Sequence, residues 1–199
     1  MDAVGGMGRG GPGVNTWRRL TVLWCLVCLL SVGGAMVRAE SPAQVDTMEQ
    51  RVARVLDRVA RGSPGLARLI DSARAVLVFP EVVPMTFGEG GQYGEGALLV
   101  AGSVVAHYAS TGTEYPALPA GVPHRTDVLL FMTDEALWDF RNRPVWRLGL
   151  DGRVSVLEHR RPAPWSAAGD QSPVLGFSLA GPALREPLGL ANNTLSRIR

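Results

Sequence analysis

The stretch AVLVFPEVVPMTFGEGGQYGEGALLV, residues 75–100, decides how this chain should fold. Two short apolar runs, 76–79 and 97–100, are bounded by Pro80 and by glycines, which is typical of β-strands. Glycine suits positions where the backbone takes positive φ, bulges or closely approaches another segment. We therefore expect a tightly turned β element here. Its structural glycines are expected to be Gly88, Gly90, Gly91, Gly94 and Gly96.

The sequence before this stretch predicts two helices. Between Ser41 and Arg61, apolar residues recur at spacings of three and four, which places them on one face of an amphipathic helix. Pro42 suits the first turn, and Gly62 is expected to cap the C-terminus. Ser63-Pro64 is expected to begin a second, shorter helix. The apolar stripe of the first helix consists of Val45, Met48, Val52, Val55 and Val59.

The sequence after residue 100 has mostly β patterns. Residues 126–132 predict a buried strand, and Thr133 is expected to cap a short helix that continues to Phe140. Asp151-Gly152 is a strong turn signal and predicts a hairpin between 145–148 and 153–157. Further strands are expected at 103–108, 174–179 and 194–198, with loops at 111–123 and 161–172.

These patterns predict one α+β domain. With 199 residues, 46% of them hydrophobic, the chain is long enough to bury a core. We expect N-terminal amphipathic helices packed on a largely antiparallel, glycine-rich β-sheet.

Residues 1–39 have the pattern of an export signal peptide. Arg18-Arg19 forms a basic region, 20–32 an apolar region, and Val37–Ala39 a small-residue cleavage site. Export by the general or the twin-arginine route fits the pattern. We expect a periplasmic or secreted protein beginning at Glu40, or alternatively one that keeps residues 1–39 as an N-terminal membrane anchor.

Both cysteines of the chain lie within this apolar region. Large residues, Trp24 and Val27, precede Cys25 and Cys28, whereas a lipoprotein signal requires a small residue there. Lipidation is therefore not expected. Cleavage after Ala39 would leave a chain that can form neither a disulfide nor a thiolate metal site.

The net charge of +2 does not indicate a nucleic-acid partner. All twenty basic residues are arginine. Four of them, and one of the eighteen acids, lie before Glu40, which leaves sixteen arginines against seventeen acids. A mature chain of about −1 lacks the basic excess of a nucleic-acid-binding domain.

No pattern indicates catalysis, a cofactor or a metal. The three histidines, at 107, 124 and 159, lie in separate segments without ligand spacing. A phosphate cradle needs a strand-to-helix turn and a basic residue, whereas the glycine block leads into a strand and holds Glu89 and Glu95. Glu89 and Glu95 could alternatively form a pair of carboxylates. We expect no enzyme.

The arginine-rich helices are the feature with functional content. Residues 51–74 hold six arginines against Asp57 and Asp71, a local charge of +4. An arginine-flanked helix suits anionic lipid headgroups. The alternative is a core-packed helix whose arginines are solvated or paired with Asp57, as in Arg54–Asp57 and Asp57–Arg61. The candidate lipid-binding residues are Arg51, Arg54, Arg58, Arg61, Arg68 and Arg74.

Three motifs carry a resemblance to a known family. VLVFP (76–80), FGEGGQYGEGALLV (87–100) and DVLLFMTDEALWDF (127–140) resemble the SYLF family, a lipid-binding domain related to yeast actin-patch proteins. The similarity extends from about Ser63 to Arg199. This chain differs at residues 84–86, Pro-Met-Thr, where relatives usually have Lys-Ala-Gly, and at Pro119 and Pro123 in a strand of the family.

The resemblance implies a non-enzymatic module that binds anionic phospholipid in a bacterial cell envelope. The expected organisation is a signal peptide at 1–39, an amphipathic helix at 40–62 and a SYLF-like domain at 63–199. The alternative is a structural or protein-interaction component of the envelope without a lipid ligand, with an envelope protein as partner.

Processing provides the first test. The intact mass of protein recovered from the periplasm should correspond to a chain that starts at Glu40 and carries no acyl group. Recovery of the full-length chain in the membrane fraction would instead support the retained anchor.

Overall fold

The computed structural model describes residues 46–85, 91–115, 117–118, 120–157, 172–181, 183–185 and 192–198. They belong to one compact unit that begins at residue 45. The helices in this part are α2 (Met48–Gly62), α3 (Pro64–Ser72) and α4 (Asp134–Asn142). The strands are β1 (Ala75–Pro84), β2 (Gln92–Val100), β3 (Ser103–Gly112), β4 (Arg125–Phe131), β5 (Val145–Arg147), β6 (Val154–Val156), β7 (Val174–Ala180), β8 (Ala183–Arg185) and β9 (Thr194–Arg197).

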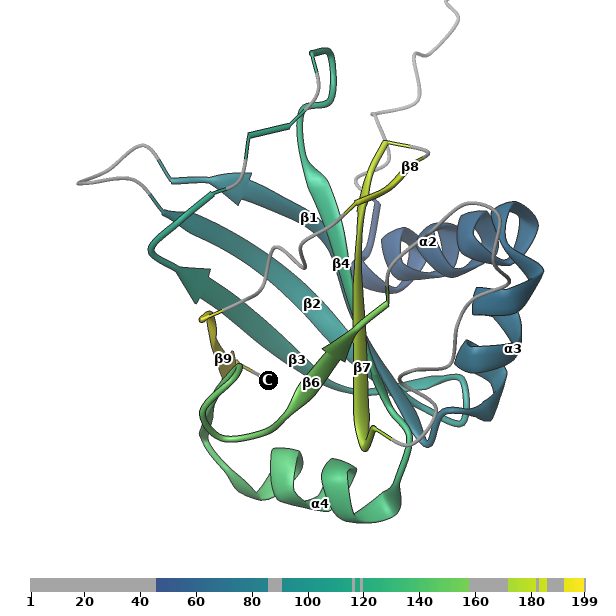
Figure 1. The fold of residues 1–199 in the computed structure, drawn as a ribbon, viewed down its shortest axis with the longest axis vertical. Coiled ribbons are helices and arrows are strands. Elements are labelled where there is room, and N and C mark those ends of the chain that lie inside the picture. Colours follow the sequence, from purple (N-terminus) through teal and green to yellow (C-terminus); the bar gives the residue numbers. More distant parts are fainter. Residues whose placement is uncertain are drawn as a thin grey trace, which may run out of the picture. The chain divides into compact units, whose positions relative to one another are not determined.

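The described strands form one sheet. Its order is β5-β9-β3-β2-β1-β4-β7-β6, and β8 pairs with β7 (Figure 1). Neighbouring strands run antiparallel except that β6 is parallel to β7. The expected α+β fold with a largely antiparallel sheet is confirmed.

Both faces of the sheet are buried. On one face, the valines of α2 and Leu66 of α3 pack with strand residues such as Val78 and Phe177. On the other face, Leu137 and Phe140 of α4 join a second cluster. Figure 1 shows α2 and α3 together on one side of the sheet and α4 at its lower end. Within the described residues, no helix has the length and apolarity needed to span a bilayer.

A capping box begins α2. The Thr47 hydroxyl accepts a hydrogen bond from the Gln50 N–H at 3.3 Å, and the Gln50 side chain accepts one from the Thr47 N–H at 2.9 Å. This reciprocal pair satisfies two backbone donors at the helix start. The predicted start of this helix near Pro42 was wrong, because Thr47 is the N-cap and α2 begins at Met48. Pro42 and Val45 themselves lie outside the described residues.

Side-chain caps begin α3 and α4 as the sequence predicts. Ser63 and Thr133 each accept a hydrogen bond from a backbone N–H of the first turn. The expectation that Gly62 caps α2 was wrong, because Gly62 is its last residue and Ser63 takes the cap position with φ −152°. Pro64 explains this, since the residue before proline is kept out of the helical region.

Strand β1 continues past Pro80, where the sequence predicted an end. Its pairing with β2 shifts between Val78 and Glu81, which marks a β-bulge around the proline. Proline cannot donate to the ladder and is tolerated at bulges. The strand therefore reaches Pro84, and residues 81–84 pair with residues 92–95 of the glycine block.

The hairpin expected across Asp151 and Gly152 does not form. β5 pairs with β9 and β6 pairs with β7, while an isolated bridge joins Leu148 to Gly152. The Asp151 carboxylate accepts a hydrogen bond from the Arg147 N–H at 2.8 Å, which occupies an edge donor of β5. The Trp146 ring fills the space beneath the turn, 2.1 Å from where a Cβ on Gly152 would lie. Backbone hydrogen bonds from the Leu150 and Asp151 N–H groups to the Arg147 carbonyl, at 3.2 and 2.9 Å, close this turn together with these side chains and without a second strand.

The described glycines of the glycine block allow close packing of β2. Gly91 has φ +149°, which disfavours other residues. A Cβ on Gly94 would lie 2.9 Å from a β1 side chain, and one on Gly96 only 2.4 Å from a β1 carbonyl oxygen. These close approaches agree with the structural role expected of the three. Gly88 and Gly90 lie outside the described residues.

Replacing Gly96 by alanine should lower the free energy of unfolding by about 1–3 kcal/mol, because the new Cβ would press on a carbonyl oxygen and on the Phe79 ring. Urea unfolding followed by circular dichroism measures this. The matched control is Gly62→Ala, where no atom lies within 4 Å of a Cβ and the backbone is helical. That variant should be as stable as the wild type or slightly more stable. Unchanged stability in Gly96→Ala would contradict the close approach.

Candidate functional site

The arginines of α2 lie at the surface of a helix that is fixed to the core. Val52, Val55 and Val59 are 1%, 4% and 4% exposed. At 3.6 residues per turn, the arginines lie roughly 120° around the helix from these valines. The α2 row consists of Arg51, Arg54, Arg58 and Arg61.

Two arginines of the α2 row pair with nearby acids. The Arg54 guanidinium donates two hydrogen bonds to the Asp46 carboxylate, at 2.9 and 2.6 Å, and lowers its pKa. Arg61 pairs with Asp57 one turn earlier. The pair that the sequence suggested between Arg54 and Asp57 is replaced by the one with Asp46, at the helix start.

Two further arginines pair with acids distant in sequence. Arg51 lies 3.6 Å from Glu81 of β1, and Arg74 lies 3.7 Å from Asp134 of α4. Together with Asp46, three acids from outside residues 51–74 therefore approach these arginines. They lower the local charge from +4 to +1. The charge of the segment is smaller on the folded surface than along the sequence.

Arg58 of α2 and Arg68 of α3 differ from the other four. Both side chains are exposed, and within the described part of the chain neither forms an ion pair. They are the arginines best placed to meet an external anion.

A groove of about 490 Å³ lies between α2, α3 and the turn from β2 to β3. Leu56, Ala60 and Ile70 give it an apolar wall, and Asp57 and Asp71 lie at its rim. Leu56 and Ala60 stand two residues from Arg58, so they lie almost opposite it on the helix. The groove therefore lies on the side of α2 away from Arg58, while Arg61 approaches its rim through the ion pair with Asp57.

Two carboxylates meet where β1 crosses the glycine block. Glu81 and Glu95 are directly opposite in the antiparallel ladder. The Tyr93 hydroxyl donates to Glu95 at 2.8 Å, which raises the tyrosine pKa, and Arg51 approaches Glu81. The sequence offered Glu89 as partner of Glu95, but Glu89 lies outside the described residues. Glu81 was missed because Pro80 was taken as the end of its strand.

The histidines do not assemble a metal or catalytic centre in the described part. His107 lies 3.5 Å from Glu49, His124 lies in the loop before β4, and residue 159 is outside the described residues. Among the described residues, no group of three or more potential ligands could hold a metal ion.

A charged pair is completely buried in β4. Asp127 is 0% exposed and Arg125 is 3% exposed, and the Arg125 Nε donates to both carboxylate oxygens at 2.9 and 3.1 Å. Burial raises the pKa of the Asp127 carboxyl, and the arginine and the Ser178 hydroxyl oppose that shift. The Tyr115 ring covers the guanidinium at 5.0 Å. The hydrogen bonds that Asp127 accepts from Arg125 and Ser178 help to offset the cost of burying this pair.

The pair continues into a longer chain of hydrogen bonds. Arg125 donates to the Gln92 side chain, whose amide donates to Asn193 at 2.6 Å. Asn193 in turn donates to the Ser110 hydroxyl at 2.9 Å. This buried polar chain connects five segments of the sheet region and lies beside the glycine block. Its members are Ser178, Asp127, Arg125, Gln92, Asn193 and Ser110.

One signal for this buried polar chain is present in the sequence. Arg125 and Asp127 are two apart in a strand, so they lie on one face of it. Gln92 and Asn193 are polar residues in loop-like surroundings and carry no such signal. Because the buried polar chain is enclosed by the protein, its role is to hold the strands together.

No known protein-family model matches the chain, and no curated protein sequence matches it either. The similarity of the three motifs to the SYLF family therefore stays an expectation. Function has to be inferred from the surfaces described above.

Replacing Asp127 by asparagine should lower the free energy of unfolding by roughly 3–5 kcal/mol, because Arg125 would remain buried without its carboxylate. Chemical unfolding measures the change. Asp139→Asn is the matched control, since Asp139 pairs with Arg143 at the surface and its loss should cost no more than about 1 kcal/mol. Equal losses in the two variants would contradict the structural role of the buried pair.

Proposed function

We propose that this protein is a non-enzymatic binding module that docks on the anionic phospholipid surface of a bacterial cell envelope. The observation that carries this proposal is the exposure of Arg58 and Arg68 on helices whose apolar sides are packed on the sheet. The resemblance to the SYLF family supports the same ligand class.

Electrostatic attraction between the arginines and the lipid headgroups makes the contact, rather than insertion of apolar side chains into the bilayer. The valines of α2 are buried under the helix, so they are not available to enter a bilayer. Each arginine close to an anionic surface contributes ~1 kcal/mol, and this attraction is screened beyond ~8–10 Å at physiological salt. Two such arginines give weak, salt-sensitive binding.

Paired arginines of the α2 row can add to this contact. Arg54 and Arg61 keep 53% and 71% of their side chains exposed while bonded to their carboxylates. Ion pairs at the surface are worth only about 0–1 kcal/mol, so a lipid phosphate can share or replace the acid at little cost. Binding therefore strengthens as the helix approaches the headgroups.

We place the module in the envelope on the basis of the expected export signal, with residues 1–39 either removed or kept as an anchor. A second candidate function is a protein-interaction component of the envelope without a lipid ligand. Two observations favour it: the ion pairs lower the charge of the arginine-rich segment, and Trp138 of α4 is 69% exposed.

Processed protein should co-sediment with vesicles that contain anionic phospholipid, should not do so with zwitterionic vesicles, and should be released by high salt. The double variant Arg58→Gln/Arg68→Gln should lose most of this binding, because it removes the two arginines of α2 and α3 that form no ion pair with another described residue. The bound fraction is measured at several salt concentrations.

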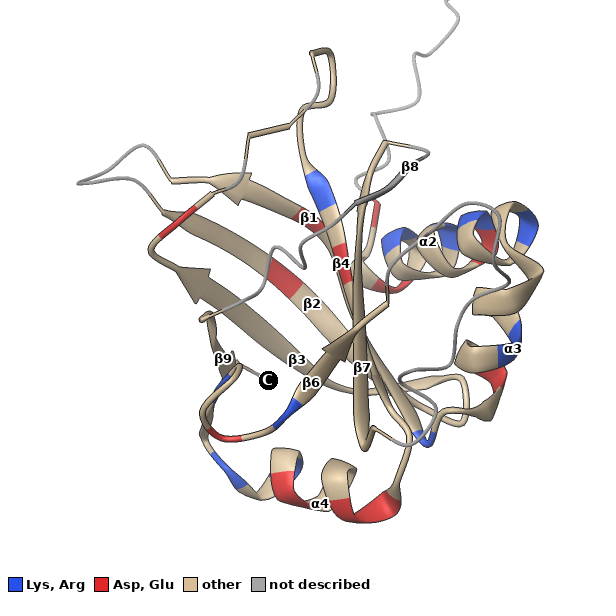
Figure 2. Cartoon of the chain, in the orientation of Figure 1, with Lys and Arg blue, Asp and Glu red and all other residues tan. Residues whose placement is uncertain are grey.

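The control is Arg153→Glu, which changes the net charge by the same amount at an exposed position before β6. Figure 2 shows the basic residues of α2 and α3 in blue. It should bind like the wild type, and circular dichroism should show all three proteins folded. Equal binding to neutral vesicles would mean apolar insertion instead. No binding by the folded protein would favour the protein-interaction function.

A further inference from the structure

The helix α2 covers only one end of the sheet face on which it packs. Val78 of β1 and Ala97 of β2 belong to the apolar cluster that contains the α2 valines. The first turn of α2 lies beside β3, where Glu49 is 3.5 Å from His107, the residue opposite Ala97. From there β1, β2 and β3 continue past the end of the helix, as Figure 1 shows. Part of this face is therefore left without α2.

The register of the strands shows which side chains occupy this uncovered sheet face. Residues directly opposite in a ladder point to the same side, as do residues two apart in a strand. Beyond β3, the face extends over Ser196 of β9 to Val145 of β5. Its members on the first three strands are Glu81 and Val83 of β1, Tyr93 and Glu95 of β2, and Ala109 and Thr111 of β3.

Apolar side chains are exposed on the uncovered sheet face. Val83 is 40% exposed and lies opposite Tyr93, and Val145 at the far edge is 44% exposed. Neither of the two apolar clusters of the core includes Val83, Tyr93 or Ala109. Covering these side chains with a partner would remove apolar surface from water, which favours association.

The charge of the uncovered sheet face is negative. The strands β1, β2 and β3 contain Glu81, Glu95 and His107 but no arginine, and Figure 2 shows red and no blue on them. Glu95 accepts a hydrogen bond from the Tyr93 hydroxyl at 2.8 Å and forms no ion pair with another described residue. It is therefore the carboxylate of this face best placed to meet an external cation.

The charges at the start of α2 do not cancel this negative charge. Arg51 approaches Glu81 at 3.6 Å, and Arg54 is bonded to Asp46. With His107 neutral, four carboxylates and two guanidiniums leave a net charge of −2 at this border. The charged groups counted are Asp46, Glu49, Arg51, Arg54, Glu81 and Glu95.

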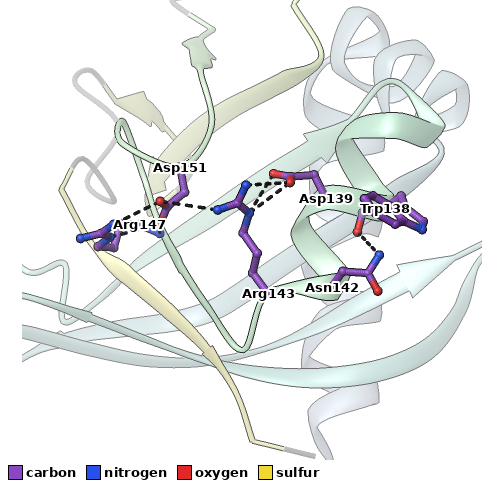
Figure 3. A network of polar contacts seen from close by, with 6 residues as sticks. All are labelled: Trp138, Asp139, Asn142, Arg143, Arg147 and Asp151. Atoms are coloured by element: carbon purple, nitrogen blue, oxygen red, sulfur yellow. Dashed lines mark hydrogen bonds and ion pairs between the residues drawn. The ribbon is translucent and has the colours of Figure 1, made fainter.

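The arginines near the far edge of the face are balanced by acids. Arg147 of β5 is bonded to Asp151, while Arg143 is bonded to Asp139 and approaches Asp151, as Figure 3 shows. Two carboxylates thus offset two guanidiniums there. The uncovered sheet face as a whole therefore favours a cationic partner.

We propose that the uncovered sheet face docks a basic amphipathic helix of a partner protein. A lysine or arginine of that helix would pair with Glu95, whose carboxylate has a second oxygen beside the one that Tyr93 binds. Apolar side chains of the helix would pack on Val83 and on the Tyr93 ring. A helix is favoured over an added strand, because β2 and β3 are paired on both sides here and offer no free edge. The proposal concerns a different surface from the lipid contact and does not depend on it.

Neither an anionic membrane nor a second copy of this chain fits the face as well. The net negative charge would repel anionic headgroups. A second copy could bring Arg58 or Arg68, but the apolar side of its α2 is packed on its own sheet. That helix would leave Val83 without an apolar contact, whereas an amphipathic partner helix supplies both charge and apolar surface.

The test uses three fluorescein-labelled peptides of about 15 residues, a length at which isolated helices begin to be stable. The basic peptide has lysine on one helix face and leucine on the other. In the neutral peptide Gln replaces each Lys, and in the alanine peptide Ala replaces each Leu. Fluorescence anisotropy with the processed protein should show the basic peptide binding about tenfold more tightly than either of the others. Salt should weaken its binding.

Glu95→Gln should weaken binding of the basic peptide by about fivefold, because it removes the carboxylate but keeps an oxygen that can accept the Tyr93 hydrogen bond. The matched control is Glu135→Gln, which removes an exposed carboxylate from α4, on the other face of the sheet. This variant should bind like the wild type. Circular dichroism should show both variants folded.

Four results would overturn the proposal. They are no binding of the basic peptide up to ~1 mM, equal binding of the neutral peptide, equal binding of the alanine peptide, and unchanged binding in Glu95→Gln. Self-association that is lost in Glu95→Gln, measured by analytical ultracentrifugation, would assign the face to a second copy instead. The Arg58→Gln/Arg68→Gln variant should still bind the basic peptide, so the two functions are tested separately.

Discussion

The buried ion pair between Arg125 and Asp127 is the constraint on which the sheet depends. Neither charge can reach water, so each needs every hydrogen bond it makes. Arg125 is bonded through Gln92 to Asn193, and Asp127 is bonded to Ser178. These bonds fix β2, β7 and the residue before β9 relative to β4. Apolar packing is nondirectional, whereas these hydrogen bonds fix the positions of particular residues on β4, β7 and β2 relative to one another.

The position of the helices follows from the sheet. With β1 and β2 closely packed at the glycine block, the face beside them accepts the valines of α2, and that contact leaves the arginines outside. The fold thereby produces two surfaces of different chemistry. One carries Arg58 and Arg68 on α2 and α3. The other is the exposed side of α4, which carries Trp138 and Arg141.

The sequence correctly predicted the structural features that depend on residues close together in the chain. The caps at Ser63 and Thr133, the apolar stripe of α2 and the buried strand β4 all follow from neighbouring residues. Its predictions failed where contacts between distant segments determine the local structure. Pro80 is accommodated because a bulge forms against β2. The turn at Asp151 closes on Arg147 through backbone and side-chain hydrogen bonds instead of forming a hairpin.

The candidate site was predicted only in part for the same reason. Periodicity placed the α2 row on one side of a helix, but the acids that pair with Arg51 and Arg54 come from β1 and from the segment before α2. The acid that pairs with Arg74 comes from α4. Likewise, Glu81 and Glu95 become opposite only after β1 pairs with β2. Pairing across the fold, which no local pattern encodes, changes a charge of +4 into one of +1.

The central claim is that α2 belongs to the folded core and offers its arginines from there. Amide hydrogen exchange of the processed protein, with and without anionic vesicles, measures this directly. We expect the amides around Val52, Val55 and Val59 to be strongly protected in both states, as those of the central strands are. Rapid exchange in α2 of the free protein, with protection appearing only on vesicles, would contradict the claim and show a helix that folds on the membrane.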